Sequence, residues 1–433
     1  MRFTHLSEWL CWQETLHPVA IDLGLERLRR TLERLQWQRP ACPIVTVGGT
    51  NGKGSCVALL NRMLTEAGYR VGTFTSPHLL RYNERIVIAD REVSDASLLA
   101  AFERIDAARG TDTLTFFEFN ALAALLVFET AGLDAIVLEV GLGGRLDAAN
   151  AIDADAALVA SIALDHCDWL GHDVELIGRE KAGIFRAGRP AIFGSREMPR
   201  SIADVAAAVG ARLSRLGEDF DYTRHDTDWS WQGRASRREN LPFPALVGAR
   251  QFDNAAAVLA VLESLSDRLP VGHDAVARGL QHVSLPGRFQ VVRARAEWIL
   301  DVAHNPAAAK ALAGQLAARS SAGRTIAVCG ILGDKDIEAI VAELRGSFDE
   351  WVVAGLVSAR AVDVDQLVQR LRSQGVTVVA TGADIAQACE IANDRASTGD
   401  RVVVFGSFLT VGPAMQWLKE KQPLPGRSQV IDA

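Results

Sequence analysis

Hydrophobic residues follow two different spacings along most of the 433-residue chain. Short runs rich in Val, Ile and Ala have few polar interruptions, which predicts buried strands. The longer stretches between them carry apolar residues three and four positions apart, which predicts amphipathic helices. Because strands and helices alternate, we expect mostly parallel sheets that are covered by helices on both faces.

Two alternating series are visible, and a segment of different character separates them. The first series has predicted strands at 44–48, 70–75, 135–140, 156–163 and 190–194, and predicted helices at 4–15, 22–36, 54–67, 95–107, 117–131, 174–185 and 251–266. Charges, tryptophans and turn residues interrupt the pattern at 215–245, which indicates a small antiparallel sheet or long loops. The second series has predicted strands at 298–303, 324–329, 351–355, 376–380 and 401–406, and predicted helices at 306–319, 336–346, 363–373 and 384–396. We therefore expect two α/β domains with a boundary near 286–296, and a cleft that closes on a ligand.

Composition and charge exclude several classes of protein. The chain is 48% apolar, its net charge is −7 and its pI is near 5.8, with no basic stripe that would suit a nucleic acid. Its six cysteines include no Cys-x-x-Cys pair, which argues against a zinc ribbon or thioredoxin-like chemistry. The first residues lack a signal-peptide core, and no apolar run approaches the roughly 20 residues of a membrane span. We therefore expect a soluble cytoplasmic protein that binds neither nucleic acid nor membranes.

A glycine-rich segment, Gly48-Gly49-Thr50-Asn51-Gly52-Lys53-Gly54-Ser55, lies between a predicted strand and a predicted helix. Glycines allow backbone N–H groups to converge on an anion, and the start of the helix adds partial positive charge. Lys53 could reach terminal phosphates, and the Ser55 hydroxyl could ligate Mg²⁺. The commonest form of this motif has no residue between Lys and the hydroxyl, whereas Gly54 intervenes here. An ordinary glycine-rich turn is the alternative, but the strand–turn–helix context favours ATP binding.

Polar residues follow several predicted strands, at the sheet edge where α/β proteins bind ligands. Glu139 lies in an apolar run, where a carboxylate is costly unless it binds a metal or pairs with an arginine. His166 could ligate a metal or could be structural. Ser76 and His78 flank a proline, so they belong either to the same site or to an ordinary turn. The pattern alone leaves each pair of alternatives open.

Four further residues suggest roles only weakly on their own. Lys181 lies in a predicted helix, where pairing with Glu180 or Glu175 at the surface would be the ordinary interpretation. In the second series, Asp301 could accept hydrogen bonds from a ribose or an adenine, and His304 could stack on them or donate to them. Arg288 could reach a phosphate from the linker.

Taken together, these motifs resemble the folylpolyglutamate synthase/dihydrofolate synthase family, which is related to the Mur peptide ligases. The matching stretches, in the family's order and over nearly the whole chain, are 49–55, 75–79, 139–147, 165–166, 179–184, 287–288 and 301–306. The resemblance implies an α/β fold with an ATPase-like phosphate-loop domain at 1–288, which carries a parallel sheet and the pterin site. It also implies a smaller Rossmann-like ligase domain at 289–433.

The resemblance also implies roles that the residues alone do not establish. ATP would be bound by Gly49, Thr50, Asn51, Gly52, Lys53, Gly54, Ser55, Asn254, Arg288, Asp301 and His304. Mg²⁺, as two ions, would be held by Ser55, Ser76, Glu139 and His166, and a monovalent cation is possible. Lys53, His166 and Lys181 would be catalytic, with Lys181 carbamylated so that a cation becomes an anionic oxygen ligand. Ser76, His78, Arg81, Phe116 and Asp147 would bind the pterin substrate, under a mobile loop at 78–85.

The implied reaction is ATP-dependent addition of L-glutamate to dihydropteroate and to tetrahydrofolates through an acyl phosphate, in folate biosynthesis and one-carbon metabolism. Monomeric protein is expected. One alternative is a synthase with the folate activity alone. Another is a Mur-type amino-acid ligase for a cell-wall nucleotide, although the phosphate loop at residue 48 leaves little room for that family's additional N-terminal domain. A small-molecule kinase would not need a second α/β domain, and a nucleotide-dependent switch would be expected to carry an Asn-Lys-x-Asp motif, which is absent.

Overall fold

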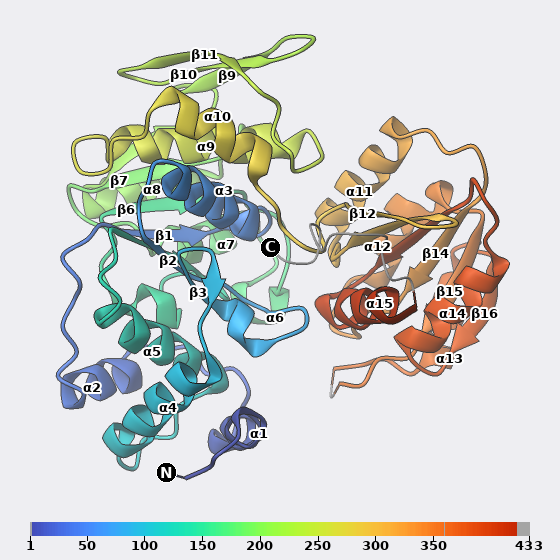
Figure 1. The fold of residues 1–433 in the computed structure, drawn as a ribbon, viewed down its shortest axis with the longest axis horizontal. Coiled ribbons are helices and arrows are strands. Elements are labelled where there is room, and N and C mark those ends of the chain that lie inside the picture. Colours follow the sequence, from blue (N-terminus) through green and yellow to red (C-terminus); the bar gives the residue numbers. More distant parts are fainter. Residues whose placement is uncertain (1, 359, 422–433) are drawn as a thin grey trace. The chain divides into compact units, whose positions relative to one another are not determined.

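The computed structural model describes residues 2–358 and 360–421, which form two units (Figure 1). The first unit comprises residues 2–78, 82–245 and 250–283, and the second comprises 79–81, 246–249 and the chain from 284 onward. Two short segments therefore belong to the second unit although the chain around them belongs to the first. Each unit is built around its own sheet, as the two alternating series predict.

The first unit contains an eight-stranded sheet of order β4-β3-β2-β5-β1-β6-β7-β8. Its strands are β1 Ile44–Gly48, β2 Val71–Phe74, β3 Ile86–Ile88, β4 Arg91–Glu92, β5 Ala135–Glu139, β6 Ala156–Val159, β7 Pro190–Phe193 and β8 Arg212–Arg215. Every neighbouring pair from β2 to β8 is parallel, whereas β3 and β4 are antiparallel additions at one edge. Because β2, β5, β1 and β6 are four consecutive parallel strands, the residues that follow their carboxyl ends share one edge of the sheet.

Helices of the first unit are α1 Leu6–Leu16, α2 Glu26–Arg34, α3 Lys53–Glu66, α4 Asp95–Arg109, α5 Phe116–Glu129, α6 Cys167–Leu170, α7 Val174–Ala182, α8 Arg200–Val209, α9 Arg250–Ser264 and α10 His273–His282. α5 is buried on nearly all sides because its sequence is almost uniformly apolar. It begins at a capping box in which Thr115 accepts a hydrogen bond from the Glu118 backbone N–H and Glu118 accepts one from the Thr115 backbone N–H. This cap fixes the position of Phe116, the first residue of the helix.

A three-stranded antiparallel sheet interrupts the alternating pattern, as the sequence indicates. It consists of β9 Asp221–Arg224, β10 Trp229–Gln232 and β11 Arg237–Leu241 (Figure 1). Trp229 and Trp231 are fully buried, and the indole N–H of Trp231 donates to the carbonyl oxygen of Ala256 on α9 at 3.1 Å. The two tryptophans therefore attach this sheet to the helix that carries Asn254.

The second unit contains a six-stranded sheet of order β12-β13-β17-β14-β15-β16, parallel except for β12. Its strands are β12 Gln290–Arg293, β13 Glu297–Asp301, β14 Thr325–Cys329, β15 Glu350–Ala354, β16 Val378–Gly382 and β17 Arg401–Phe405. Its helices are α11 Pro306–Ala318, α12 Ile337–Leu344, α13 Val364–Ser373, α14 Ile385–Arg395 and α15 Phe408–Lys421. The sheet has an apolar cluster on each face, which is expected for a sheet with helices on both sides.

Several elements differ from the sequence-based expectation. Helices α6, α8, α10 and α15, strands β3, β4, β8 and β12, and the short 3₁₀ helices η1 Tyr82–Arg85, η2 Ala148–Ala151 and η3 Arg345–Ser347 were not predicted. The strand predicted at 156–163 is too long, because β6 ends at Val159 and its continuation binds the phosphate loop instead of a neighbouring strand. Pro413 lies inside α15, where a proline normally argues against a helix. None of the described helices has the length and apolar character needed to cross a membrane.

Candidate active site

The phosphate loop connects β1 to α3 and contains two glycines in the left-handed region. Gly49 has a φ of 135° and Gly52 has a φ of 90°, conformations in which a side chain would be strained. The loop is held by the segment that follows β6: the Thr50 N–H donates to the Ser161 carbonyl oxygen at 2.7 Å. The Thr50 hydroxyl also donates to the Ala163 carbonyl oxygen at 3.1 Å and accepts a hydrogen bond from the Ala163 N–H at 3.1 Å. These contacts fix the loop at the start of α3, where an anion is favoured.

Two lysine side chains meet at this loop. The Lys53 amine donates to the carbonyl oxygens of Gly49 at 3.0 Å and of Thr50 at 3.2 Å. The Lys181 amine, from α7, donates to the same Gly49 oxygen at 3.1 Å, and Lys181 is only 5% exposed. Burial, and then the charge of Lys53, lower the pKa of Lys181 to about 7.

The surface interpretation of Lys181 is therefore wrong. Glu180 pairs with Arg145 at 2.9 Å, and Glu175 accepts hydrogen bonds from the backbone N–H groups of Arg200 and Ser201 instead. Glycine at 144 makes room for this arrangement, because a Cβ there would lie 2.9 Å from the Lys181 Cα.

Asn254 supports the loop from α9. Its side-chain oxygen lies 3.6 Å from the Cys56 thiol, and its amide nitrogen donates to the side-chain oxygen of Gln251 at 2.9 Å. A Cβ at Gly52 would lie 2.6 Å from the Asn254 oxygen. The loop backbone and the Asn254 amide therefore pack so closely that only glycine fits between them.

Two of the predicted metal-ligating residues, Glu139 and Ser76, lie at the ends of the neighbouring strands β5 and β2. The Glu139 carboxylate, 5% exposed at the end of β5, accepts a hydrogen bond from the Ser76 backbone N–H at 3.2 Å. Ser55 is buried in the first turn of α3. His166 lies seven positions beyond the end of β6, opens α6 and has a φ of 52°, so it does not directly follow a strand as expected.

The chemical types of these ligand atoms suit a divalent cation. Mg²⁺ prefers carboxylate and hydroxyl oxygens, and a nearby cation would offset the cost of burying the Glu139 carboxylate. Among the described residues, no group of three or more His, Cys, Asp and Glu side chains forms a metal site by itself. A site of the expected composition would therefore need hydroxyl and phosphate oxygens as additional ligands.

His78 belongs to a cluster of side chains that includes residues not predicted from the sequence. Its Nδ1 accepts a hydrogen bond from the Arg85 Nε–H at 2.9 Å, and burial followed by the Arg85 charge lowers the pKa of His78 to about 4. The Arg85 guanidinium lies 5.8 Å from the ring centre of Tyr82 and 5.5 Å from that of Phe116. The Tyr82 hydroxyl donates to the side-chain oxygen of Asn120. His78 and the predicted pterin-pocket residue Phe116 are thus joined through Arg85.

Asp147 lies between β5 and the short helix η2, and it is 2% exposed. Its carboxylate accepts hydrogen bonds from the backbone N–H groups of Leu142 at 2.8 Å and Ala149 at 2.9 Å. Burial raises the pKa of Asp147 to about 6, although these hydrogen bonds oppose the shift. Asp147 therefore orders the glycine-rich turn that follows β5.

In the second unit, the residues expected to bind the nucleoside gather at the end of β13. The Asp301 carboxylate accepts hydrogen bonds from the backbone N–H groups of Phe289 and Ala303, both at 2.8 Å. Burial raises the pKa of Asp301, and the Arg288 charge opposes this shift. The Arg288 guanidinium lies 5.1 Å from the ring centre of Phe408, and the His304 imidazole lies 6.5 Å from the same ring. Arg81 also belongs to the second unit, in the segment 79–81.

Sequence reasoning missed Arg85 as a site residue. Its signal is weak but present: a single arginine precedes the apolar run of β3, where a buried charge is unusual. Tyr82 and Asn120 carry no comparable signal, because one resembles a core aromatic and the other lies within a helix.

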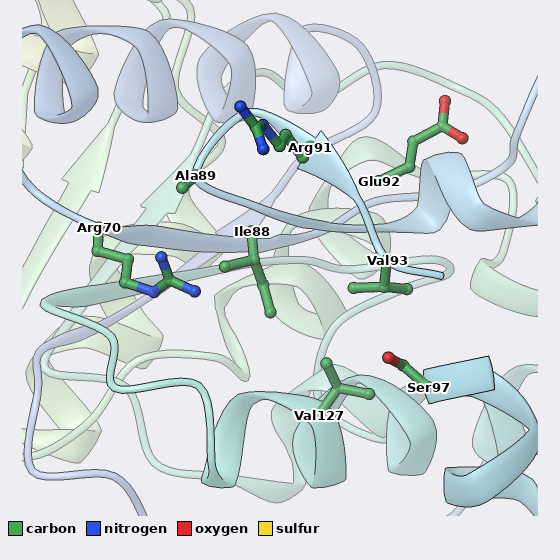
Figure 2. Close-up of a pocket in the computed structure, with 8 residues that line it drawn as sticks. All are labelled: Arg70, Ile88, Ala89, Arg91, Glu92, Val93, Ser97 and Val127. Atoms are coloured by element: carbon green, nitrogen blue, oxygen red, sulfur yellow. The ribbon is translucent and has the colours of Figure 1, made fainter. Parts of the chain in front are cut away.

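The first unit has a cavity of about 450 Å³ near the start of β2, away from the carboxyl ends of the strands. Figure 2 shows the side chains of Ile88, Val93 and Val127 directed toward a common space, with Arg70 and Arg91 beside it. Arg70 precedes β2 and Ile88 pairs with Gly72 near the start of β2, whereas Ser76 follows the end of that strand. This cavity is therefore separate from the phosphate loop.

Comparisons with known proteins agree with the geometry. The family described as "Mur ligase, glutamate ligase domain" matches residues 287–408. The dihydrofolate synthase/folylpolyglutamate synthase of Escherichia coli K12 is 46% identical over 411 residues, covering 95% of each chain. The structure of E. coli FolC in complex with DHPP and ADP has a TM-score of 0.92 and 45% identity, over 97% of this chain and 99% of that one. A bifunctional folylpolyglutamate synthase/dihydrofolate synthase from Yersinia pestis, complexed with AMPPNP and a Mn ion, has a TM-score of 0.89 and 47% identity, over 96% and 98%.

High identity over nearly the full length of these relatives confirms the family that the motifs suggest, together with the two-domain α/β fold and the enzyme class. The chain belongs to the dihydrofolate synthase/folylpolyglutamate synthase family of ATP-dependent, Mur-type ligases.

Proposed function

We propose that this enzyme joins L-glutamate to dihydropteroate and to reduced folates, with ATP hydrolysed to ADP and phosphate through an acyl phosphate. One observation carries the proposal: two lysine amines converge on the phosphate loop, beside a buried carboxylate on the adjacent strand end. That arrangement suits the transfer of a phosphoryl group. The likeness to proteins named for both activities, and to structures that contain DHPP, ADP, AMPPNP and Mn, supports the choice of substrates.

The chemistry requires activation because a carboxylate oxygen is a poor leaving group. A carboxylate oxygen of the pterin substrate attacks the γ-phosphorus of ATP in line, so that an O–P bond forms and the bond to ADP breaks. The α-amine of glutamate then attacks the acyl carbon, a C–N bond forms, and phosphate leaves with its bonding electrons as the amine loses a proton. A dry site prevents water from taking the place of glutamate.

Residues of the first unit would divide this work. Lys53 would shift from the loop carbonyls to the terminal phosphates and offset their charge, with the loop N–H groups and the start of α3. Ser55, Ser76, Glu139 and His166 would hold divalent cations, which would supply further positive charge to the phosphate oxygens. Two Mg²⁺ ions and a monovalent cation remain our proposal. Asn254, Arg288, Asp301 and His304 are our proposed nucleotide-binding residues outside the loop.

Lys181 is suited to carbamylation. Because its pKa is about 7, a large share of the amine is neutral and nucleophilic at neutral pH. The amine nitrogen would attack CO₂, a C–N bond would form and a proton would leave, giving a carbamate anion beside Lys53. Mass spectrometry under native conditions, with and without bicarbonate, tests this modification; an unmodified Lys181 in fully active enzyme would exclude it.

The substrate assignment is tested with purified enzyme, Mg²⁺ and ATP, and with dihydropteroate and tetrahydrofolate supplied separately. We expect glutamate-dependent phosphate release and a new amide with both. An amide with tetrahydrofolate alone would indicate a single-activity synthase, and phosphorylated substrate without amide would indicate a kinase. We further propose a monomer that acts in the cytoplasm; light scattering of the eluting protein tests the oligomeric state.

A further inference from the structure

We propose that Arg85 fixes the imidazole of His78 in its neutral Nε2–H form, so that His78 donates a hydrogen bond from Nε2 to the pteroyl part of the substrate. The proposal rests on the proposed function for the identity of the substrate. It assigns Arg85 as a positioning residue and gives the His78 imidazole one fixed hydrogen-bonding direction.

The geometry of one hydrogen bond carries the tautomer. The Arg85 Nε–H lies 2.9 Å from Nδ1 of His78, and a guanidinium can only donate. Nδ1 must therefore accept, so it bears no proton. A neutral imidazole with an unprotonated Nδ1 carries its proton on Nε2, and that nitrogen is then a donor.

The surroundings hold Arg85 in this position. Its side chain is 7% exposed, and its guanidinium lies near the rings of Tyr82 and Phe116. The Tyr82 ring also lies 6.1 Å from the His78 imidazole, in an edge-to-face arrangement. Tyr82 is itself fixed by the hydrogen bond from its hydroxyl to Asn120. An arginine held between two aromatic rings has little freedom to release His78.

The free nitrogen of His78 is available to a ligand. Among the described residues, Nε2 has no recorded hydrogen-bond partner, and the side chain is only half-buried. Phe116, which the resemblance assigns to the pterin pocket, begins α5 and lies in the same cluster. A donor at this place suits a carbonyl oxygen or a ring nitrogen of the pteroyl group, which dihydropteroate and folates share.

A matched pair of substitutions tests the substrate contact. In His78→Gln the side-chain amide nitrogen can occupy the position of Nε2, whereas His78→Asn keeps an acceptor for Arg85 but has no atom at that position. We expect the KM for dihydropteroate to rise about tenfold in His78→Asn, the size expected for one lost hydrogen bond. In His78→Gln it should stay within about threefold, and kcat and the KM for ATP should change little in both. Equal effects of the two substitutions, or a larger effect of His78→Gln, would overturn the contact.

The tautomer is read directly in ¹⁵N-histidine-labelled enzyme by long-range ¹H–¹⁵N correlation spectra, with His78→Asn used for assignment. We expect the Nε2–H pattern in the wild type, a mixture of tautomers in Arg85→Met, and recovery of the single tautomer in Arg85→Lys, which still has a donor. Arg91→Met, an exposed arginine on β4, is the control and should leave the pattern unchanged.

An Nδ1–H form in the wild type, or an unchanged pattern in Arg85→Met, would overturn the positioning role. This spectrum requires no turnover. An enzyme that shows the predicted tautomer but forms no amide would therefore refute the proposed function separately from the role of Arg85.

Discussion

The side-chain amines of Lys53 and Lys181 both donate to the carbonyl oxygen of Gly49, at 3.0 and 3.1 Å. Two cations that share one oxygen repel each other, and the more buried one loses its proton more easily. Lys181 is that residue, with a pKa of about 7. The pair therefore places Lys53 beside an amine, that of Lys181, which can exist in neutral form.

Lys181 lowers the stability of the fold at neutral pH. Its folded pKa of about 7 lies below the ordinary 10.5, so between these values the unfolded chain binds more protons and the free energy of unfolding rises with pH. Each pKa unit corresponds to about 1.4 kcal/mol. In CO₂-free buffer, Lys181→Met should therefore be more stable than the wild type toward urea at pH 7, and this difference should shrink as the pH approaches 10.

The exposed Lys310 on α11 provides the control for this experiment. Lys310→Met should follow the wild type at every pH. If Lys181→Met were less stable at pH 7, or if its difference from the wild type did not vary with pH, the buried amine would not be the cause. Lys181→Met should also lose activity, because it removes the amine that the proposed carbamate requires. A buried amine at this position would thus lower stability while serving function.

Lys53 should matter for the chemical step and not for folding. In Lys53→Ala the positive charge beside the transferring phosphoryl group is lost, and we expect kcat to fall about 10³-fold or more. The melting temperature should change little because, within the part of the chain that the structure describes, the Lys53 amine donates only to the carbonyl oxygens of Gly49 and Thr50 in its own loop. Near-normal glutamate ligation by Lys53→Ala, measured in steady state, would contradict the role of the loop.

Gly52 and Gly68 form a matched pair that separates backbone strain from crowding. Their φ values are 90° and 91°, but a Cβ on Gly52 would lie 2.6 Å from the Asn254 oxygen, whereas one on Gly68 would meet nothing within 4 Å. Either alanine substitution should cost about 1 kcal/mol of stability from the backbone conformation. Only Gly52→Ala should also weaken ATP binding, by tenfold or more in calorimetry. Comparable ATP affinity in the two variants would show that the contact with Asn254 does not shape the loop.

Glu139 should control the requirement for a divalent cation. Glu139→Gln keeps the size of the side chain but removes its charge, so the Mg²⁺ concentration for half-maximal activity should rise at least tenfold. Glu218→Gln, at an exposed turn, is the control. Binding of Mn²⁺ in the presence of ADP, followed by electron paramagnetic resonance, checks the effect without turnover. Unchanged Mn²⁺ affinity would exclude Glu139 as a ligand.

The alternation of strands and helices could be predicted from the sequence because it reflects burial on two faces of each sheet, and β1, β5 and β14 follow the expected ranges closely. The helix α10 was missed because its apolar face is short and packs on α3, which only the fold reveals. Strand β12 was missed because only its two middle residues, Val291 and Val292, are apolar. Strand β3 was missed because its apolar run, Ile86–Ile88, is shorter than the four to eight residues expected of a strand.

The site was harder to predict than the fold. Lys53 and Glu139 follow from the general rule that ligands bind at the carboxyl ends of strands. The burial of Lys181 could not be derived from its own helix, because it depends on Gly144 of another loop and on the Gly49 carbonyl. Arg85 was missed for a similar reason. Its contacts with His78 and Phe116 arise from tertiary packing, and the hydrophobic pattern around residue 85 does not indicate them.

The central claim is that the substrate carboxylate is activated by phosphoryl transfer, and an isotope measurement tests it most directly. Dihydropteroate labelled with ¹⁸O in its carboxylate is incubated with enzyme, ATP, Mg²⁺ and L-glutamate, and the released phosphate is analysed by mass spectrometry or ³¹P NMR. An acyl phosphate must pass one labelled oxygen to each phosphate, so we predict one ¹⁸O per phosphate in step with amide formation. Amide formation with unlabelled phosphate would contradict the account.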